Sequence, residues 1–240
     1  MNRFFQLCWV IGGTLLSHAL LALEPAAVAT ISAEDLIDFE LQPVPIQELI
    51  RRALALTEKE LTYQFGSNSP GNAGMDCSGS VQFVLKSSGL EELPRTSFGF
   101  YEWALQKGTL TKTEGIHSTE DPVFAALKPG DLLFWTGTYA TAKRNPPISH
   151  VMIFLGRLKS DGQGVVFGAS DGRRFRGKRI TGVSVFDWQV PVAESNSKFV
   201  AFGPVPGFEE LSAEAVSEEP EPTKKPLQAI LEKLLNKKGG

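Results

Sequence analysis

Helical and strand-like hydrophobic patterns occupy different halves of this chain. Apolar residues at helical spacing run from Ile46 to about Lys59, and a second helical face begins after Asp76. Beyond residue 131 the chain carries short apolar runs separated by turn residues. These runs are 132–135, 150–155, 165–169, 183–186 and 199–201. The order predicts an α+β fold in which helices pack against a mainly antiparallel sheet.

The N-terminus has the pattern of a secretory signal peptide. Arg3 precedes an apolar run over residues 4–16, and small residues follow before residue 30. We therefore expect residues 1–29 to be a signal peptide, with cleavage after Ala22 or an uncleaved amphipathic N-terminus as the alternatives. No later run has the roughly 18 to 20 apolar residues of a membrane span. The sequence thus predicts an exported protein, periplasmic or extracellular, with no transmembrane segment.

The rest of the chain divides into a domain and a polar tail. Residues 30–42 form an acidic N-terminal segment, and we expect the domain to span 43–208. Residues 209–226 are rich in Glu, Ala, Ser and Pro, which predicts a flexible linker. Residues 227–240 predict a short amphipathic helix that is marginal alone. It either frays or contacts a protein or a membrane surface through 227–237.

Charge and cysteine content exclude several classes of function. The 24 basic and 27 acidic residues give a formal net charge of -3, which offers no general attraction to nucleic acid. After removal of the signal peptide the chain keeps Cys77, His117 and His150. One cysteine cannot form an intramolecular disulfide, and these three residues lack the spacing of a zinc site. No metal or other cofactor is expected, and Cys77 is free, bonded to another molecule, or reactive.

Cys77 lies at the start of a predicted helix, directly after Asp76 in the N-cap position. Unpaired backbone N–H groups and the helix dipole favour an anion there, such as a thiolate. Lowering a cysteine pKa by two to four units corresponds to roughly 3 to 5 kcal/mol, and the dipole supplies about 1 kcal/mol. A nearby imidazolium would have to supply the rest, and His150 at the start of an apolar strand is the candidate. A small buried structural cysteine is the alternative.

Two motifs surround these residues. Asp-Cys-Ser-Gly occupies residues 76–79, and Ser-His-Val-Met-Ile occupies residues 149–153. They resemble the Asp-Cys-Ser-Gly and His-Val-Gly-Ile signatures of the NlpC family of cell-wall cysteine peptidases. The resemblance covers about residues 44–207 and implies a reduced papain-like fold, with N-terminal helices packed on a five- to six-stranded sheet. Further blocks match in family order at 63–66, 93–97, 127–135 and 154–156.

The resemblance also implies catalytic roles. Cys77 would be the nucleophile, and His150 the general base that later protonates the leaving amine. The family has a third, orienting residue on the next strand, but Gly168 stands where that residue is usually histidine. Ser170 is our candidate for the third member, with Asp171, a backbone carbonyl or a water molecule as alternatives.

Four further residues are candidates for the oxyanion and substrate site: Tyr63, Asp76, Ser78 and Arg95. The resemblance implies that Tyr63 reaches towards the oxyanion and that Asp76 receives a cationic substrate terminus. Core packing for Tyr63 and a helix cap for Asp76 are the alternatives. The planar fork of Arg95 suits a substrate carboxylate, and a surface ion pair is the alternative. The basic cluster at 173–179 is interpreted as a solvated loop, or as a contact with an anionic wall polymer.

These assignments predict an exported cysteine peptidase that hydrolyses amide bonds in peptidoglycan stem peptides. The resemblance alone points to the bond between D-glutamyl and the diamino acid. Two other hypotheses stay open. Gly168 favours a catalytically weak or inactive cell-wall-binding module. The Cys–His pair and the amphipathic tail favour a papain-like acyltransferase.

Overall fold

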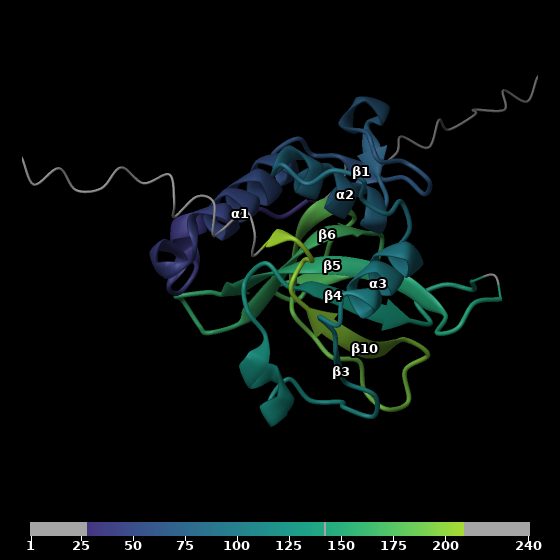
Figure 1. Cartoon of the computed structure of the whole chain (residues 1–240). Helices are drawn as coiled ribbons and strands as arrows, with labels where there is room; N and C mark the ends of the chain where they lie inside the picture. Colours follow the sequence, from purple (N-terminus) through teal and green to yellow (C-terminus); the bar gives the residue numbers. More distant parts are fainter. Residues whose placement is uncertain (1–27, 142, 209–240) are drawn as a thin grey trace, which may run out of the picture.

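Three α-helices cover one side of an antiparallel sheet in the computed structural model, which describes residues 28–141 and 143–208 (Figure 1). The helices are α1 (Val44–Thr57), α2 (Cys77–Ser87) and α3 (Ser97–Gln106). Of these, α1 and α2 coincide closely with the two helices expected from apolar spacing. Pro43 and Pro45 bracket the start of α1, where a missing N–H costs no intrahelical hydrogen bond.

The sheet has the strand order β3-β10-β4-β5-β6-β9, and each neighbouring pair is antiparallel. The predicted α+β class and antiparallel sheet are therefore confirmed. Two small additions lie outside it: the parallel pair β1 (Thr62–Tyr63) and β2 (Gly74–Met75), and the hairpin β7 (Arg174–Phe175) and β8 (Lys178–Arg179). The strands of the main sheet are β3 (Thr111–Lys112), β4 (Leu132–Thr136), β5 (Ile148–Arg157), β6 (Gly164–Ser170), β9 (Gly182–Asp187) and β10 (Lys198–Gly203).

Both faces of the sheet are buried, each in its own hydrophobic cluster. Successive strand side chains point to opposite faces, so neighbours such as Phe134 and Trp135 belong to different clusters. The helix-side cluster joins the helices to β4, β5 and β6, and the second cluster is rich in aromatic rings. Side chains of the strand β5 are buried in both clusters, and this strand carries His150.

The N-terminal segment expected at 30–42 packs on the domain expected at 43–208. Ala33, Leu36 and Phe39 are buried in the helix-side cluster. The N–H of Ala29 donates to Ser184 Oγ at 2.6 Å, and its carbonyl accepts from the N–H of Val185 at 2.9 Å. Cleavage after Ala29 would remove these contacts, whereas cleavage after Ala22 would keep them. The acidic side chains lie outward, which explains why composition suggested a peripheral segment.

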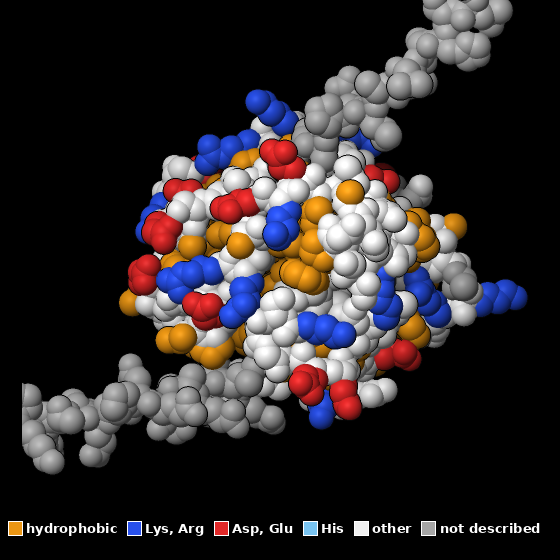
Figure 2. All heavy atoms as spheres, turned by 90° about the horizontal axis from the view of Figure 1, so that it is seen from above, with side chains coloured by type: hydrophobic (Ala, Val, Ile, Leu, Met, Phe, Trp, Pro, Cys, Tyr) orange, Lys and Arg blue, Asp and Glu red, His pale blue; other side chains and the backbone are white. Residues whose placement is uncertain are grey.

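Several sequence predictions fall outside the described residues. They are the signal peptide up to residue 27, the linker at 209–226, and the C-terminal helix at 227–240 with its contact at 227–237. None of the helices in the described part combines the length and hydrophobicity needed to cross a bilayer. Acidic and basic side chains are interspersed over the face seen in Figure 2.

Candidate active site

Asp76 organises the turn that leads into α2. Its carboxylate accepts hydrogen bonds from the N–H groups of Gly79 at 2.6 Å and Gly66 at 2.8 Å. The predicted N-cap is confirmed, and the same side chain ties the preceding loop to the helix. One of the orphan N–H groups of this helix start, that of Gly79, thus finds an acceptor.

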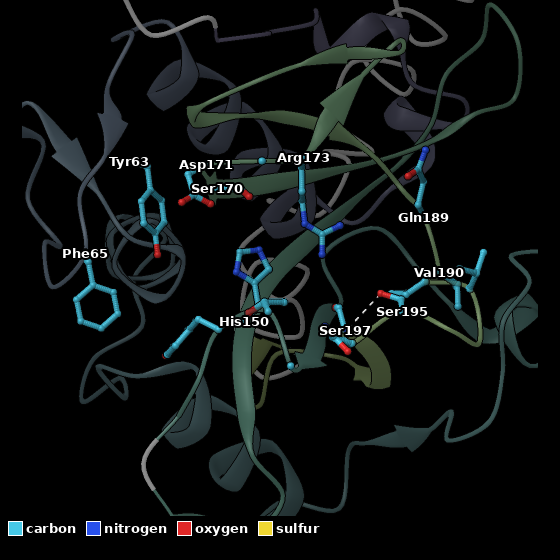
Figure 3. Close-up of a pocket in the computed structure, with 17 residues that line it drawn as sticks. Tyr63, Phe65, His150, Ser170, Asp171, Arg173, Gln189, Val190, Ser195 and Ser197 are labelled. Carbon is cyan, nitrogen blue, oxygen red and sulfur yellow. Dashed lines mark hydrogen bonds between the residues drawn. The ribbon is translucent and has the colours of Figure 1, made fainter. Parts of the chain in front are cut away.

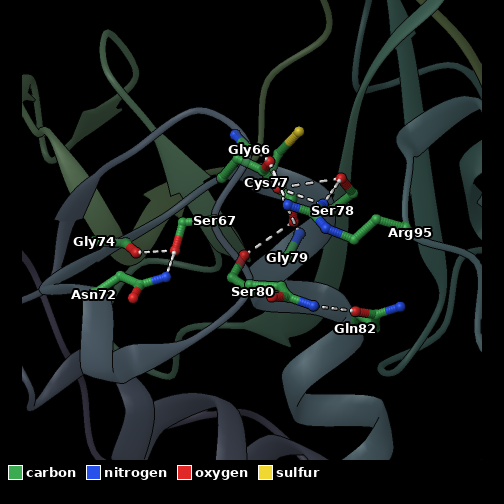
Figure 4. A network of polar contacts seen from close by, with 12 residues as sticks. Gly66, Ser67, Asn72, Gly74, Cys77, Ser78, Gly79, Ser80, Gln82 and Arg95 are labelled. Carbon is green, nitrogen blue, oxygen red and sulfur yellow. Dashed lines mark hydrogen bonds and ion pairs between the residues drawn. The ribbon is translucent and has the colours of Figure 1, made fainter.

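Arg95 pairs with this carboxylate through both of its terminal nitrogens. Nη2 lies 2.8 Å from one oxygen of Asp76, and Nη1 lies 3.1 Å from the other. Nη1 also donates to Ser78 Oγ at 3.0 Å, which closes the network in Figure 4. Arg95 and Asp76 therefore make an ion pair beside Cys77. An ion pair was the alternative interpretation of Arg95, and a helix cap was the alternative interpretation of Asp76.

Gly79, the last residue of the Asp-Cys-Ser-Gly motif, is required by close backbone contact. A Cβ atom there would lie 2.1 Å from the carbonyl oxygen of Ser67 and 2.8 Å from Asn68 Cα. Because these are backbone atoms, no side-chain rearrangement relieves the clash. Glycine therefore lets the loop over residues 64–76 lie against the first turn of α2, which fixes the position of Cys77.

The Cys77 thiol is buried and has a raised pKa. Burial and the negative charge of Asp76 raise the pKa to about 11, and nearby backbone N–H groups, including that of Val151, oppose the shift. Val151 follows His150 on β5, so Cys77 lies close to the strand expected to carry its base. The sulfur points away from the Asp76–Arg95 network (Figure 4).

His150 is also buried, with 6% of its surface exposed. Its ring packs edge-on against Trp135, with the centroids 5.7 Å apart. Nε2 has no hydrogen-bond partner among the residues that the structure describes. Burial, followed by the positive charge of Arg173, holds the pKa of His150 well below its usual value.

These surroundings favour a neutral thiol and a neutral imidazole at rest. The sequence predicts a resting thiolate–imidazolium pair, which the structure does not favour, because burial penalises both charged forms. The helix start stabilises a thiolate, but Asp76 holds a full negative charge next to it. A neutral pair can still perform base catalysis if the proton moves from sulfur to imidazole as the substrate is attacked.

The pH dependence of Cys77 alkylation tests this state. Since the folded protein keeps the thiol protonated, iodoacetamide labelling of Cys77, mapped by mass spectrometry, is expected to accelerate with pH up to about 11. His150→Ala is expected to leave unchanged the pH range over which labelling accelerates, because a neutral imidazole provides no charge that lowers the pKa of the thiol. A fast labelling plateau already present at pH 6 to 7, lost in His150→Ala, would instead establish the ion pair.

Cys77 and His150 line two adjoining cavities, which share Tyr63, Phe65 and Tyr139. The Cys77 cavity measures about 320 Å³ and includes Asp76, Ser78 and Arg95. The His150 cavity measures about 860 Å³ and includes Ser170 and Arg173 (Figure 3). Phe65 and Tyr139 meet edge to face, with ring centroids 5.9 Å apart. Every candidate site residue from the sequence thus lies in one of these cavities, and Tyr63 lies in both.

The expected position of the third catalytic residue is closed by Met152. A Cβ atom on Gly168 would lie 2.9 Å from Met152 Cε. In the His-Val-Gly-Ile signature that residues 150–153 resemble, Met152 stands at the glycine position, and its side chain takes the space next to Gly168 on the paired strand. Ser170, the proposed substitute, is buried in the wall of the His150 cavity, and no hydrogen bond joins it to His150 in the described part of the chain.

A double-mutant cycle tests whether these two positions are coupled. Gly168→His alone is expected to destabilise the fold by about 1 to 3 kcal/mol through overpacking. Met152→Gly alone leaves a cavity, and the double substitution fills it. The double variant should therefore be more stable than the sum of the single effects by about 0.5 to 3 kcal/mol in urea unfolding. Additivity within 0.5 kcal/mol would mean that the two residues do not share this space.

Arg173 is the site residue that sequence interpretation missed. It was grouped with a solvated basic loop, but its guanidinium carbon lies 4.2 Å from the centroid of the Trp135 ring, beside His150. Its neighbours Arg174, Arg176 and Arg179 are exposed, as expected. Arg173 differs from these neighbours because its loop packs against β4, a strand that is distant in the sequence. His117 is exposed.

A buried cysteine at a helix start, beside a histidine on an antiparallel sheet, defines the class of papain-like α+β folds. The sequence model of the NlpC/P60 family matches residues 60–183. That is more than half of the chain, and the chain belongs to the NlpC/P60 family. Members of this family are generally cysteine peptidases of the cell wall and typically act outside the cytoplasm.

Comparison with individual proteins adds little beyond the family. A solved structure from Staphylococcus aureus, described as similar to a lipoprotein of the NLP/P60 family, is 20% identical over 75% of this chain, with a TM-score of 0.41. The match covers 44% of that protein, so this chain spans less than half of its length. A search of curated proteins finds no match.

Proposed function

We propose that this protein is an exported cysteine peptidase that hydrolyses amide bonds in peptidoglycan stem peptides. The observation that carries the proposal is the meeting of two cavities, one with Cys77 and one with His150, in a member of a cell-wall peptidase family. The bond between D-glutamyl and the diamino acid is the proposed target, on the resemblance of the motifs.

The proposed reaction forms and breaks one covalent bond to sulfur. His150 takes the proton of the Cys77 thiol as sulfur attacks the carbonyl carbon. The N–H groups of Cys77 and Ser78 lie near the sulfur at the start of α2, and they are proposed to stabilise the oxyanion. His150 then gives its proton to the leaving nitrogen, which departs as an amine, and water hydrolyses the acyl-enzyme.

Tyr63 and the Asp76–Arg95 pair supply the surroundings of this reaction. The Tyr63 side chain projects into the cavity (Figure 3), and burial raises the pKa of its phenol, so that it stays a neutral donor. Asp76 keeps a carboxylate in the wall of the Cys77 cavity, where it supports the binding of a cationic substrate terminus. Ser170 is proposed to line the path of the substrate next to His150.

Purified protein incubated with muropeptides tests the proposal. We expect new free amines, detected by liquid chromatography with mass spectrometry, and none from the Cys77→Ala variant. Equal release from both proteins would reject Cys77 as the nucleophile. Binding of muropeptides with no amine release would favour a wall-binding module instead.

A further inference from the structure

Arg173 is a partly buried cation whose guanidinium has no anionic partner. Its guanidinium carbon lies 4.2 Å from the centroid of the Trp135 ring, and the N–H of Ile180 donates to the backbone carbonyl of Arg173 at 2.9 Å. No residue in the ranges 28–141 and 143–208 forms a hydrogen bond or an ion pair with the guanidinium. The adjacent arginines differ, since Arg174 donates to the carbonyl of Gly177 and Arg179 to that of Asp171.

A guanidinium that is partly shielded from water and has no acceptor in the protein is suited to bind an anionic ligand. Burial lowers the pKa of Arg173 to about 10, so the side chain keeps its charge at neutral pH. Figure 3 shows it extending into the cavity towards His150. Asp171 lines the same cavity but forms no ion pair with it. The cavity therefore presents five unused N–H donors to whatever occupies it.

The position of His150 indicates which part of the substrate occupies the cavity that contains Arg173. A general acid must reach the nitrogen that leaves, so the leaving amino acid occupies the cavity of His150. The acyl part then lies in the cavity of Cys77, beside Asp76 and Arg95. Arg173 is thus placed to contact the leaving amino acid and not the acyl part.

We propose that Arg173 determines specificity by binding a carboxylate of the leaving amino acid. The proposal rests on the proposed peptidase function and adds the chemical class of the leaving group. A planar guanidinium held on an aromatic ring suits bidentate contact with a carboxylate, which an amide cannot reproduce. The same contact neutralises the charge that disfavours protonated His150, so that a correct substrate also assists transfer of the proton.

Two matched peptides test the inference. Both contain L-alanyl-γ-D-glutamyl-diaminopimelate, one with free carboxylates on the diamino acid and one with carboxamides. We expect kcat/KM to be at least tenfold higher for the carboxylate peptide. Arg173→Gln should remove this preference by slowing the carboxylate peptide, whereas Arg174→Gln, the exposed neighbour, should retain it. Equal rates for the two peptides with the unmodified protein would overturn the inference and leave the peptidase function intact.

Binding to the inactive Cys77→Ala variant tests the carboxylate site at Arg173 without catalysis. In calorimetry with Cys77→Ala, free diaminopimelate should bind at least tenfold more tightly than its bis-amide, and Cys77→Ala/Arg173→Gln should bind the two alike. If the unmodified protein cleaves neither peptide but this difference in binding is present, the peptidase function fails and the carboxylate site stands. Absence of diaminopimelate binding, or equal binding of both compounds, would reject the site.

Discussion

Replacing His150 by alanine is expected to reduce kcat/KM for amide hydrolysis by about 10³- to 10⁶-fold. The reason is the raised pKa of Cys77, about 11 in the folded protein. A thiol with this pKa is ionised to about one part in 10⁴ at pH 7. Attack therefore depends on a base that removes the proton during the reaction, and His150 is the imidazole in the adjoining cavity. Rates of amine release over pH 5 to 9 provide the measurement.

His117→Ala is the matched control for that experiment. His117 is exposed, and its Nδ1 lies 3.1 Å from the carbonyl oxygen of Pro191. Its removal is expected to leave kcat/KM unchanged within twofold. A loss of less than tenfold in His150→Ala would contradict the role of His150 as the base.

Replacing Asp76 by alanine is expected to lower the free energy of unfolding by about 3 kcal/mol. The variant loses a helix cap, worth about 0.5 to 2 kcal/mol. It also leaves the charge of Arg95 without a partner, which costs about 3 to 5 kcal/mol in fully buried pairs. Because the Arg95 side chain is 34% exposed, water recovers part of this cost, and we expect the two contributions together to reach about 3 kcal/mol. Urea unfolding monitored by tryptophan fluorescence gives the value.

Asp76→Asn separates the two contributions. Its amide oxygen can still accept from the N–H of Gly79, so the cap is retained while the charge is lost. We expect this variant to lose less stability than Asp76→Ala by the contribution of the cap, about 0.5 to 2 kcal/mol. A loss below 1 kcal/mol in Asp76→Ala would mean that the Asp76–Arg95 network does not hold the start of α2 in place.

The start of α2 was predictable because its determinants are local. Asp76 in the cap position, Cys77 after it and glycine at 79 stand next to one another in the sequence, and the apolar spacing of the helix follows. Five strands of the main sheet were predictable for the same reason, since turn residues separate short apolar runs, whereas β3 (Thr111–Lys112) was not predicted. Local signals do not extend to the edges of the domain. Leu36 and Phe39 are too few to define a helical face, although both are buried.

The electrostatics of the site could not be predicted from the sequence. The pKa values of Cys77 and His150 depend on burial by residues from several strands, and the effect of Arg173 depends on its position over Trp135. The closed position at Gly168 likewise depends on Met152 from the paired strand. Motif spacing identifies which residues can react, whereas tertiary packing determines their charge at rest.

Covalent trapping measures the nucleophile directly. The protein is mixed with L-alanyl-γ-D-glutamyl-diaminopimelate, quenched in acid within milliseconds, digested, and analysed by mass spectrometry. We expect the L-alanyl-γ-D-glutamyl group as a thioester on Cys77, appearing together with one equivalent of free diaminopimelate and absent from Cys77→Ser. Release of the amine with no adduct on Cys77, and at the same rate in Cys77→Ser, would contradict a cysteine mechanism for this protein.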